Sequence, residues 1–331
     1  MTTEPLLSVR GLTTRFRTDR GPLVAVHDVS FDVAPGETLA IVGESGSGKS
    51  VMALSILRLI PNPPGEIVAG QIVFEGHDLL KMSDAEMLAI RGNRIAMIFQ
   101  EPMNSLNPAL TVGLQVAEPM RQHRGVSWAA ALDGAKALLK KVHIPDAESR
   151  LHTYPHQYSG GMRQRAMIAM ALACRPRLII ADEPTTALDV TVQAQILDLL
   201  KELTRETGAA LILITHDLGV VARYADRVVV MYAGRVVEQA PAARLYRHPL
   251  HPYTRGLLAS VPRLDGAAGE RLVPIDGAPP DLAALPPGCA FAPRCTRALE
   301  RCAQTRPLLR AAGDASCQHH HACLRDELTV D

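Results

Sequence analysis

Short apolar, β-branched runs alternate with longer amphipathic stretches through the first 240 residues of the chain. Four of these runs are strongly apolar, and each is followed at once by glycine or a polar residue: 37–42, 94–99, 178–181 and 210–215. Runs of this kind are typical of strands buried in a sheet, and their alternation with helical stretches is typical of a parallel sheet covered by helices. The pattern predicts an α/β fold with a mostly parallel sheet.

The stretch from about residue 100 to residue 176 has a different pattern. It is rich in strong helix formers and has few strand signals, and it predicts helices over 128–141 and 162–174. Because it lies between the second and third apolar runs, we expect a helical subdomain inserted into the sheet domain.

Composition changes again after about residue 240. Prolines recur from Pro241 to Pro293, which disfavours long helices and central strands, and five of the six cysteines fall in the last 43 residues. We therefore expect a domain over 1–240 and a proline- and cysteine-rich C-terminal extension over 241–331.

Charge and hydropathy exclude several classes of protein. The 35 Lys and Arg residues nearly balance the 34 Asp and Glu residues, so no overall field favours nucleic acid, and we expect no nucleic-acid partner. The chain begins without a basic segment followed by an apolar run, and no stretch approaches the roughly 18 apolar residues of a spanning helix. These features predict a cytoplasmic protein.

A glycine-rich segment follows the first apolar run and precedes a helical stretch over 51–60. Its spacing is that of a phosphate-binding loop (P-loop), and its candidate binding residues are Gly43, Ser45, Gly46, Ser47, Gly48, Lys49 and Ser50. Glycines allow backbone N–H groups to surround phosphates, the lysine contributes a charge to the terminal phosphates, and the last serine contributes a hydroxyl to Mg²⁺. The segment predicts a site for ATP with Mg²⁺.

Polar residues also follow the other three apolar runs. Asp182 and Glu183 follow 178–181, Gln100 follows 94–99, and His216 follows 210–215. The carboxyl ends of parallel strands lie at one edge of a sheet, so we expect these side chains to converge on the P-loop. Asp182 and Gln100 are candidate Mg²⁺ ligands, Glu183 is the candidate general base, and His216 is a candidate γ-phosphate contact.

A second anion-binding helix start is predicted at Ser159, Gly160 and Gly161, where a serine N-cap and two glycines precede a helix. With this feature the sequence resembles the ATP-binding cassette (ABC) ATPases, whose signature motif reads Ser-Gly-Gly at this position. The resemblance covers residues 6 to 240 and implies a P-loop NTPase core of the RecA-like kind.

The ABC resemblance implies that each ATP site is shared by two subunits. In that family the signature of one subunit closes on the P-loop nucleotide of the other. Matched by residue, Asp189 corresponds to the interface aspartate, Gln100 begins the loop that senses the membrane partner, and Phe16 is the aromatic that stacks on adenine.

Three further segments, 99–108, 181–195 and 248–254, resemble the D-type ATP-binding subunit of bacterial dipeptide and oligopeptide importers. The resemblance implies a related F-type ATPase as partner in a heterodimer, two membrane permease subunits, an indirect link to an extracytoplasmic peptide-binding protein, and a peripheral position on the cytoplasmic face of the cell membrane. Importers of nickel and other metal complexes share much of this pattern and remain an alternative.

Two kinds of soluble ABC ATPase are alternatives of another class. A soluble ABC ATPase of DNA repair or chromosome organisation normally carries a long coiled-coil insertion, and this sequence has no stretch of that length. A soluble ABC ATPase that handles iron–sulfur clusters would use the cysteine-rich end as its working part.

The spacing of the C-terminal cysteines matches neither a zinc ribbon nor the common ferredoxin patterns, and by itself selects no metal. The extension resembles that of peptide-importer ATPases, some of which carry a [4Fe–4S] cluster on four such cysteines. On this resemblance we expect Cys289, Cys295, Cys302 and Cys317 to be the ligands and Cys323 to be a spare. Free thiols are the alternative. Cys174 is expected to be a core residue.

Overall fold

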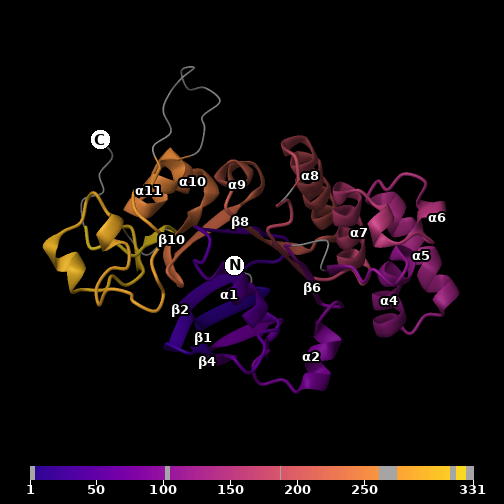
Figure 1. Ribbon diagram of the computed structural model, residues 1–331, viewed down its shortest axis with the longest axis horizontal. Helices are drawn as coiled ribbons and strands as arrows, with labels where there is room; N and C mark the ends of the chain where they lie inside the picture. Colours follow the sequence, from indigo (N-terminus) through magenta and orange to yellow (C-terminus); the bar gives the residue numbers. More distant parts are fainter. Residues whose placement is uncertain (1–3, 101–104, 187, 261–273, 314–317, 326–331) are drawn as a thin grey trace. The chain divides into compact units, whose positions relative to one another are not determined.

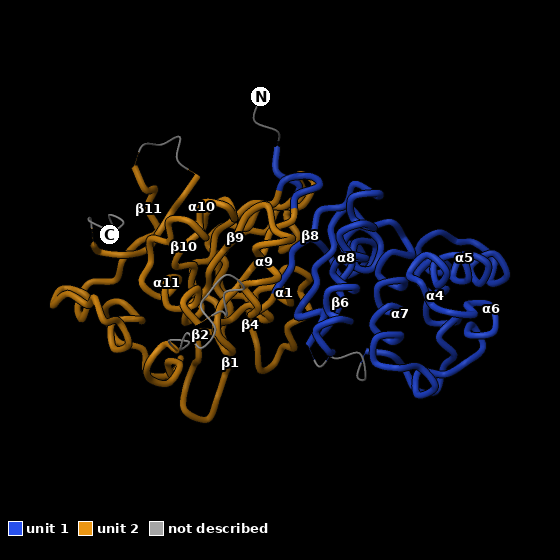
Figure 2. Tube along the Cα trace, turned by 90° about the horizontal axis from the view of Figure 1, so that it is seen from above, with its two compact units in different colours: residues 1–6, 34–37, 81–214 blue, residues 7–33, 38–80, 215–331 orange. Residues whose placement is uncertain are grey.

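The computed structural model describes residues 4–100, 105–186, 188–260, 274–313 and 318–325. Two compact units divide the chain: residues 1–6, 34–37 and 81–214 form unit 1, and residues 7–33, 38–80 and 215–331 form unit 2 (Figure 2). The change in composition at residue 240 lies inside unit 2, so the division into 1–240 and 241–331 stays a prediction.

Unit 1 is built on parallel strands β6 (Ile95–Ile98), β7 (Leu178–Asp182) and β8 (Ala210–Thr215). Ile95 lies opposite Leu178 in the first pair, and Leu178 lies opposite Ala210 in the second. Every residue of β7 and β8 is buried, which explains why both strands are apolar up to their last residues, Asp182 and Thr215. Three of the four predicted strands are therefore confirmed here.

Helices make up most of the remainder of unit 1. They are α2 (Asp84–Ile90), α4 (Val112–Arg124), α5 (Trp128–Lys141), α6 (Ala147–Arg150), the 3₁₀ turn η1 (Pro155–Gln157), α7 (Gly160–Leu172) and α8 (Val190–Thr207). Between β6 and β7 the described residues form only helices and turns (Figure 1). The helical subdomain over about 100–176 stays a prediction. Helix α7 packs against α4, α5 and α8.

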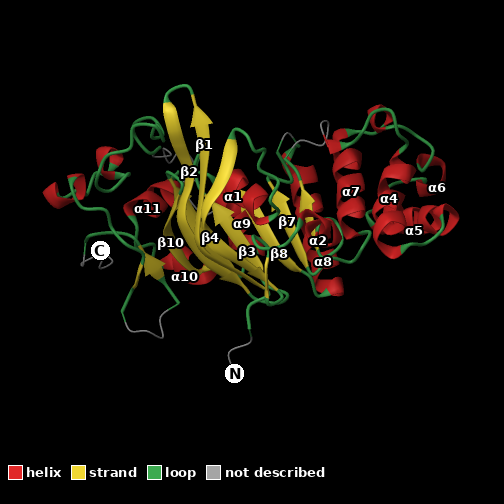
Figure 3. Ribbon diagram, turned by 90° about the horizontal axis from the view of Figure 1, so that it is seen from below, coloured by secondary structure: helices red, strands yellow, loops and turns green. Residues whose placement is uncertain are grey.

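Unit 2 contains an antiparallel sheet in the order β2-β1-β4-β5. Its strands are β1 (Leu7–Thr18), β2 (Gly21–Val33), β4 (Gly65–Phe74) and β5 (His77–Asp78). Figure 3 shows β1, β2 and β4 as long neighbouring strands. Helix α1 (Lys49–Ile56) packs against β1 and β2. It is shorter than the predicted 51–60 because Arg58 adopts a left-handed conformation with φ 51°, which ends the helix.

The fourth predicted strand, β3 (Thr38–Val42), lies in unit 2 and is not part of the β2-β1-β4-β5 sheet. It pairs in parallel with β9 (Arg227–Tyr232), which pairs antiparallel with β10 (Arg235–Pro241). The short strand β12 (His320–His321) adds to β10, and β11 (Arg310–Ala311) adds to β12. The remaining elements are α9 (Leu218–Tyr224), α10 (Ala242–Arg247), α11 (Pro252–Ala259), η2 (Ala292–Arg294) and η3 (Glu300–Ala303).

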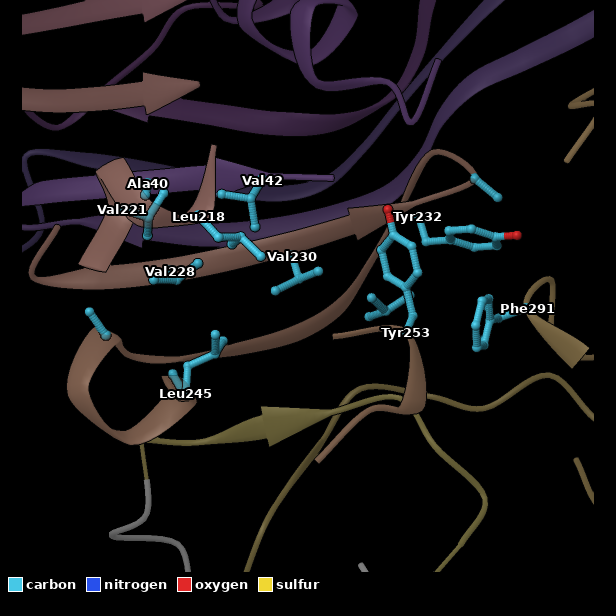
Figure 4. Close-up of a cluster of buried hydrophobic side chains, with 14 residues drawn as sticks. Ala40, Val42, Leu218, Val221, Val228, Val230, Tyr232, Leu245, Tyr253 and Phe291 are labelled. Atoms are coloured by element: carbon cyan, nitrogen blue, oxygen red, sulfur yellow. The ribbon is translucent and has the colours of Figure 1, made fainter. Parts of the chain in front are cut away.

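The C-terminal extension docks on β9 through aromatic side chains. Figure 4 shows Tyr232 of β9, Tyr253 of α11 and Phe291 gathered together. The ring centres lie 4.6 Å apart for Tyr232–Tyr253, 5.3 Å for Tyr232–Phe291 and 5.4 Å for Tyr253–Phe291. The buried rings of Tyr253 and Phe291 thus give the extension apolar contacts with Tyr232 of β9.

A buried carboxylate ties the extension together a second time. Glu238 of β10 is fully buried and accepts hydrogen bonds from Leu250 N (2.6 Å), His251 N (2.9 Å) and His319 Nε2 (2.7 Å). Burial raises the pKa of Glu238, but these hydrogen bonds outweigh it and hold the pKa below its usual value. One carboxylate thereby joins β10, the 248–254 segment and the end of the chain.

Within the described ranges, no helix is both long enough and apolar enough to cross a membrane.

Candidate nucleotide-binding site

The P-loop follows β3 and leads directly into α1, as the sequence predicts. Gly43 has φ 152°, and a Cβ there would lie 2.2 Å from the carbonyl oxygen of Met231. Gly48 has φ 96°, and a Cβ there would lie 2.4 Å from the carbonyl oxygen of Ala25. Both glycines are therefore required by the packing of the loop on β2 and β9.

Lys49 lies inside this loop with only 5% of its surface exposed. Its Nζ donates to the carbonyl oxygens of Gly43 (2.8 Å) and Glu44 (3.0 Å) and to Ser47 Oγ (3.4 Å). Gly48 precedes α1 and makes no side-chain cap hydrogen bond, so the start of this helix is not capped by the residue before it. A buried cation beside the start of a helix suits an anion with several oxygens.

A brace from the C-terminal extension holds the P-loop residue Glu44. Arg294 donates through Nη1 to Glu44 Oε2 (2.7 Å) and through Nη2 to Glu44 Oε1 (2.9 Å). The Glu44 N–H donates to the Tyr253 hydroxyl at 2.8 Å. The Glu44 hydrogen bond raises the pKa of the Arg294 guanidinium, so this guanidinium stays charged. We call Arg294, Tyr253 and Glu44 the P-loop brace.

In unit 1 the structure brings Gln100 to Glu183. Gln100 Nε2 donates to Glu183 Oε2 at 2.9 Å, and Thr186 Oγ1 donates to the same oxygen at 2.8 Å. Asp182, the last residue of β7, is 5% exposed. Glu183 has φ 46°, an uncommon conformation for a residue with a side chain, and such strain clusters at functional sites. Gln100, Asp182 and Glu183 thus form one acidic and amide cluster at the end of β7.

His216 and Phe16 lie in unit 2. His216 is exposed and follows β8, and its neighbour Asp217 caps α9 by accepting from Gly219 N at 2.8 Å. Phe16 is half-buried on β1, opposite Gly65 of β4, and a Cβ on Gly65 would lie 2.8 Å from its ring. The roles of both residues stay predictions.

The signature residues begin α7 in unit 1. Ser159 Oγ accepts from Met162 N at 3.3 Å, which confirms the predicted N-cap. A Cβ on Gly160 would lie 3.5 Å from Leu188 Cδ2, and one on Gly161 would lie 3.1 Å from Val192 Cγ1. Asp189 lies between these two neighbours in sequence and caps α8 by accepting from Val192 N at 3.0 Å. The signature and Asp189 therefore adjoin each other.

Four cysteines of the extension influence one another electrostatically: Cys289, Cys295, Cys302 and Cys323. Burial, with a contribution from Cys302 and Cys323, raises the pKa of Cys289 to about 11. Cys323, which we expected to be a spare, thus lies with three of the predicted ligands, whereas Cys317 is outside the described residues. Cys174 is 3% exposed and is a core residue, as predicted.

No set of three or more His, Cys, Asp or Glu side chains in the described part of the chain is arranged to hold a metal ion. Four thiols around an iron–sulfur cluster bind separate iron atoms, so such a set need not converge on one ion.

Sequence reasoning missed the P-loop brace. Arg294 lies 250 residues from Glu44, in a segment without helical or strand periodicity. Tyr253 lies inside the 248–254 segment that the sequence singled out, but only the fold shows that its hydroxyl reaches the P-loop.

Two family comparisons match most of the chain. Residues 26–186 match the ABC transporter family, and residues 237–302 match the oligopeptide/dipeptide transporter C-terminal region. A putative peptide import ATP-binding protein of Brucella melitensis is 55% identical over 337 residues, which cover 98% of both sequences. The dipeptide transport ATP-binding protein DppD of Bacillus subtilis is 55% identical over 304 residues, 92% of this chain and 90% of that protein.

Solved structures agree with this. A dimeric, post-hydrolysis structure of an ATP-binding cassette bound to ADP and Pi has a TM-score of 0.64 and 30% identity, covering 71% of this chain and 98% of that one. The protein cbiO1 from Clostridium perfringens has a TM-score of 0.63 and 27% identity, covering 74% and 92%. The predicted P-loop NTPase fold is thereby confirmed, and the chain belongs to the ATP-hydrolysing subunits of ABC transporters, in the group that carries the oligopeptide/dipeptide transporter C-terminal region.

Proposed function

We propose that this chain is the ATP-driven motor subunit of an importer for dipeptides or oligopeptides. The observation that carries the proposal is the Gln100–Glu183 hydrogen bond at 2.9 Å, which joins the candidate general base to the first residue of the loop that resembles the family's membrane sensor. The match of residues 237–302 and the names of the relatives support peptides as the cargo. Nickel or another metal complex is the alternative cargo.

Each residue has a defined task in this proposal. The P-loop N–H groups and Lys49 hold the phosphates of ATP, and Ser50, Asp182 and Gln100 offer the oxygen ligands that Mg²⁺ prefers. Mg²⁺ supplies charge to offset the developing negative charge on the phosphates. Glu183 accepts a proton from the attacking water while Gln100 and Thr186 fix its carboxylate, and His216 donates to the γ-phosphate.

The proposed assembly has two ATP sites. Ser159, Gly160 and Gly161 complete the site of a second, F-type ATPase, and the signature of that subunit completes the site of this one. Asp189, beside the signature, lies at the shared interface. The pair sits on the cytoplasmic face beneath two membrane permeases that receive peptide from an extracytoplasmic binding protein.

Two substitutions test the motor. Glu183→Gln keeps the phosphate contacts and removes the base, so ATP binding persists while turnover by the complex falls roughly a hundredfold or more. Lys49→Ala removes a phosphate contact and weakens binding itself. The readouts are Kd for an ATP analogue and phosphate release. Wild-type turnover by the Glu183→Gln complex would remove Glu183 from its role.

The cargo is tested separately. The tagged chain is purified from membranes with its permeases and reconstituted in vesicles, with ATP on the side of the vesicle membrane where this chain lies. The complex should then transport a radiolabelled dipeptide across the membrane. A complex that imports a nickel chelate and leaves the dipeptide outside would refute peptide import and leave the motor intact.

We also propose that the extension carries a [4Fe–4S] cluster on Cys289, Cys295, Cys302 and Cys323. The mutual influence of Cys289, Cys295, Cys302 and Cys323 supports this set. Cys317, which lies outside the described residues, stays the alternative fourth ligand. Thiolates buried there are unfavourable without iron, because burial already raises the pKa of Cys289 to about 11. The cluster would staple an extension that has little core of its own.

Iron analysis of paired variants tests the ligand set. Anaerobically purified protein should be brown, with about four iron and four sulfide per chain. Cys323→Ser should lose the colour, and the control Cys317→Ser should keep it. The reverse result would restore Cys317 as the fourth ligand, and colourless wild-type protein with no iron would refute the cluster.

A further inference from the structure

Unit 2 contains a cavity of about 420 Å³ between β2, β10 and the C-terminal extension. Its walls are partly apolar, from Tyr232, Val236, Phe291 and Leu309, and partly cationic, from Arg235 and Arg306. No residue of the P-loop lines it. The volume is in the range of small-molecule sites, and a few polar groups among apolar walls are typical of them.

The two arginines face the cavity without partners in the described structure. Neither guanidinium has a hydrogen bond or an ion pair with another described residue, and Arg235 is half-buried. Burial, and then the charge of Arg306, lowers the pKa of Arg235, which shows that the two cations repel each other. Among the described residues that line the cavity, Asp28 is the acid, and it favours the charged form of Arg235.

His27 adds a buried polar atom to the same wall. Its Nδ1 is buried without a hydrogen-bond partner among the described residues. Burial, followed by Arg235 and Arg306, lowers the pKa of His27, so the ring is neutral at physiological pH. Two arginines and one aspartate therefore leave a single net positive charge beside an unused polar atom.

We propose that this cavity binds a small organic carboxylate with an apolar body. One negative charge matches the net charge of the wall, the carboxylate oxygens suit the guanidinium groups, and the apolar body suits the aromatic and aliphatic walls. A phosphate with more than one negative charge would exceed the single positive charge of the cavity wall, and its excess charge would be buried against apolar side chains.

The cavity adjoins the support of the P-loop. Arg235 follows Gly234, whose N–H donates to Ser47 O at 3.0 Å, and His27 N donates to Gly234 O at 2.8 Å. A carboxylate in the cavity therefore contacts residues next to this turn, and its binding should be reciprocally coupled to that of ATP.

Titration calorimetry of the full chain tests the proposal with 4-phenylbutyrate, its neutral amide and inorganic phosphate at constant ionic strength. The acid should bind, and the amide and phosphate should bind at least tenfold more weakly, because they lack the single charge or the apolar body. Equal binding of acid and amide, or preference for phosphate, would overturn the proposal.

Two substitutions with opposite expected effects on the affinity for 4-phenylbutyrate test the proposal further. Arg306→Gln, at the exposed rim, should weaken 4-phenylbutyrate binding about tenfold, and Asp28→Asn should strengthen it about threefold by removing a like charge. The control Arg247→Gln removes an exposed charge that does not line the cavity and should change Kd less than twofold. If the acid does not bind, or if Arg306→Gln and Arg247→Gln give the same affinity, the assignment is wrong.

Discussion

The chain contains two glycine-rich helix starts suited to phosphate, and they are built differently. Gly48 precedes α1 in a left-handed conformation without a side-chain cap, whereas Ser159 precedes α7 in an extended conformation and caps it. The first helix start has no side-chain cap from the residue that precedes it. The second uses one hydroxyl on its own helix and leaves the two glycine N–H groups beside it.

The glycines of the two starts are required for different reasons. A Cβ on Gly43 or Gly48 would meet backbone oxygen at 2.2 or 2.4 Å, so the chain's own packing excludes any side chain. A Cβ on Gly160 would meet only a leucine methyl at 3.5 Å, an ordinary contact. No contact in the described chain requires glycine at position 160. We infer that the nucleotide bound by the proposed partner subunit requires it.

The largest effect should follow from a side chain in the P-loop. Gly48→Ala combines φ 96° with a backbone clash, so we expect a loss of roughly 3 kcal/mol or more in stability and loss of ATP binding. Gly46→Ala is the matched control, because it has φ 77° and nothing within 4 Å, and should cost about 1 kcal/mol. Chemical denaturation and Kd for ATP measure both. Equal costs would show that backbone conformation alone requires the glycines.

The signature should respond in the opposite way. Gly160→Ala should change the stability of the isolated chain by less than about 0.5 kcal/mol and leave its ATP binding intact. In the assembled complex the added methyl would disturb the nucleotide of the partner, and turnover should fall roughly a hundredfold. A stability loss as large as that of Gly48→Ala would abolish the distinction between the two helix starts.

The P-loop brace is a further difference between the start of α1 and the start of α7, because the C-terminal extension supports the P-loop residue Glu44. Its ion pair is partly buried, with side chains 7% and 25% exposed, so Arg294→Gln should weaken ATP binding by about 2 kcal/mol. Arg297→Gln is the control, since Arg297 is exposed on the same extension. A double-mutant cycle with Glu44→Gln measures the coupling, and zero coupling would remove the brace from ATP binding.

Lowering the pH should have a smaller effect on the stability of the chain. Burial lowers the pKa of His251 to about 4, and hydrogen bonds lower that of Glu238. Both pKa values are higher in the unfolded chain, so as the pH falls the unfolded chain binds protons before the folded chain does. The free energy of unfolding therefore decreases as the pH falls from about 6.5 toward 4. For His251 alone the loss between pH 7 and pH 5.5 is about 1 kcal/mol.

Hydrogen exchange checks where this acid effect acts. It should appear in α11 and the 248–254 segment before it appears in α7. The variant His251→Asn should flatten the pH dependence, because it removes the titrating ring while keeping a side chain that can cap α11. Uniform exchange across both units would show that acid does not act through the extension.

The sequence by itself determined the features that depend on local signals. Helix α5 spans 128–141 as predicted, because Ser127 caps its start by accepting from Ala130 N at 3.3 Å and strong helix formers fill its length. The P-loop and the carboxylates after β7 were also predictable. In both, an apolar run is followed at once by glycine or an acidic residue, and this pattern is visible within a few residues of sequence.

Only the tertiary structure decided the contacts that join distant segments. Arg294 reaches Glu44 across 250 residues and His319 reaches Glu238 across 81, and neither pairing has a periodicity or spacing that a sequence displays. Cys323 lies with Cys289, Cys295 and Cys302 because β12 brings the end of the described chain back to β10. Segments with little regular structure acquire their positions from what they pack against, so their local sequence cannot specify them.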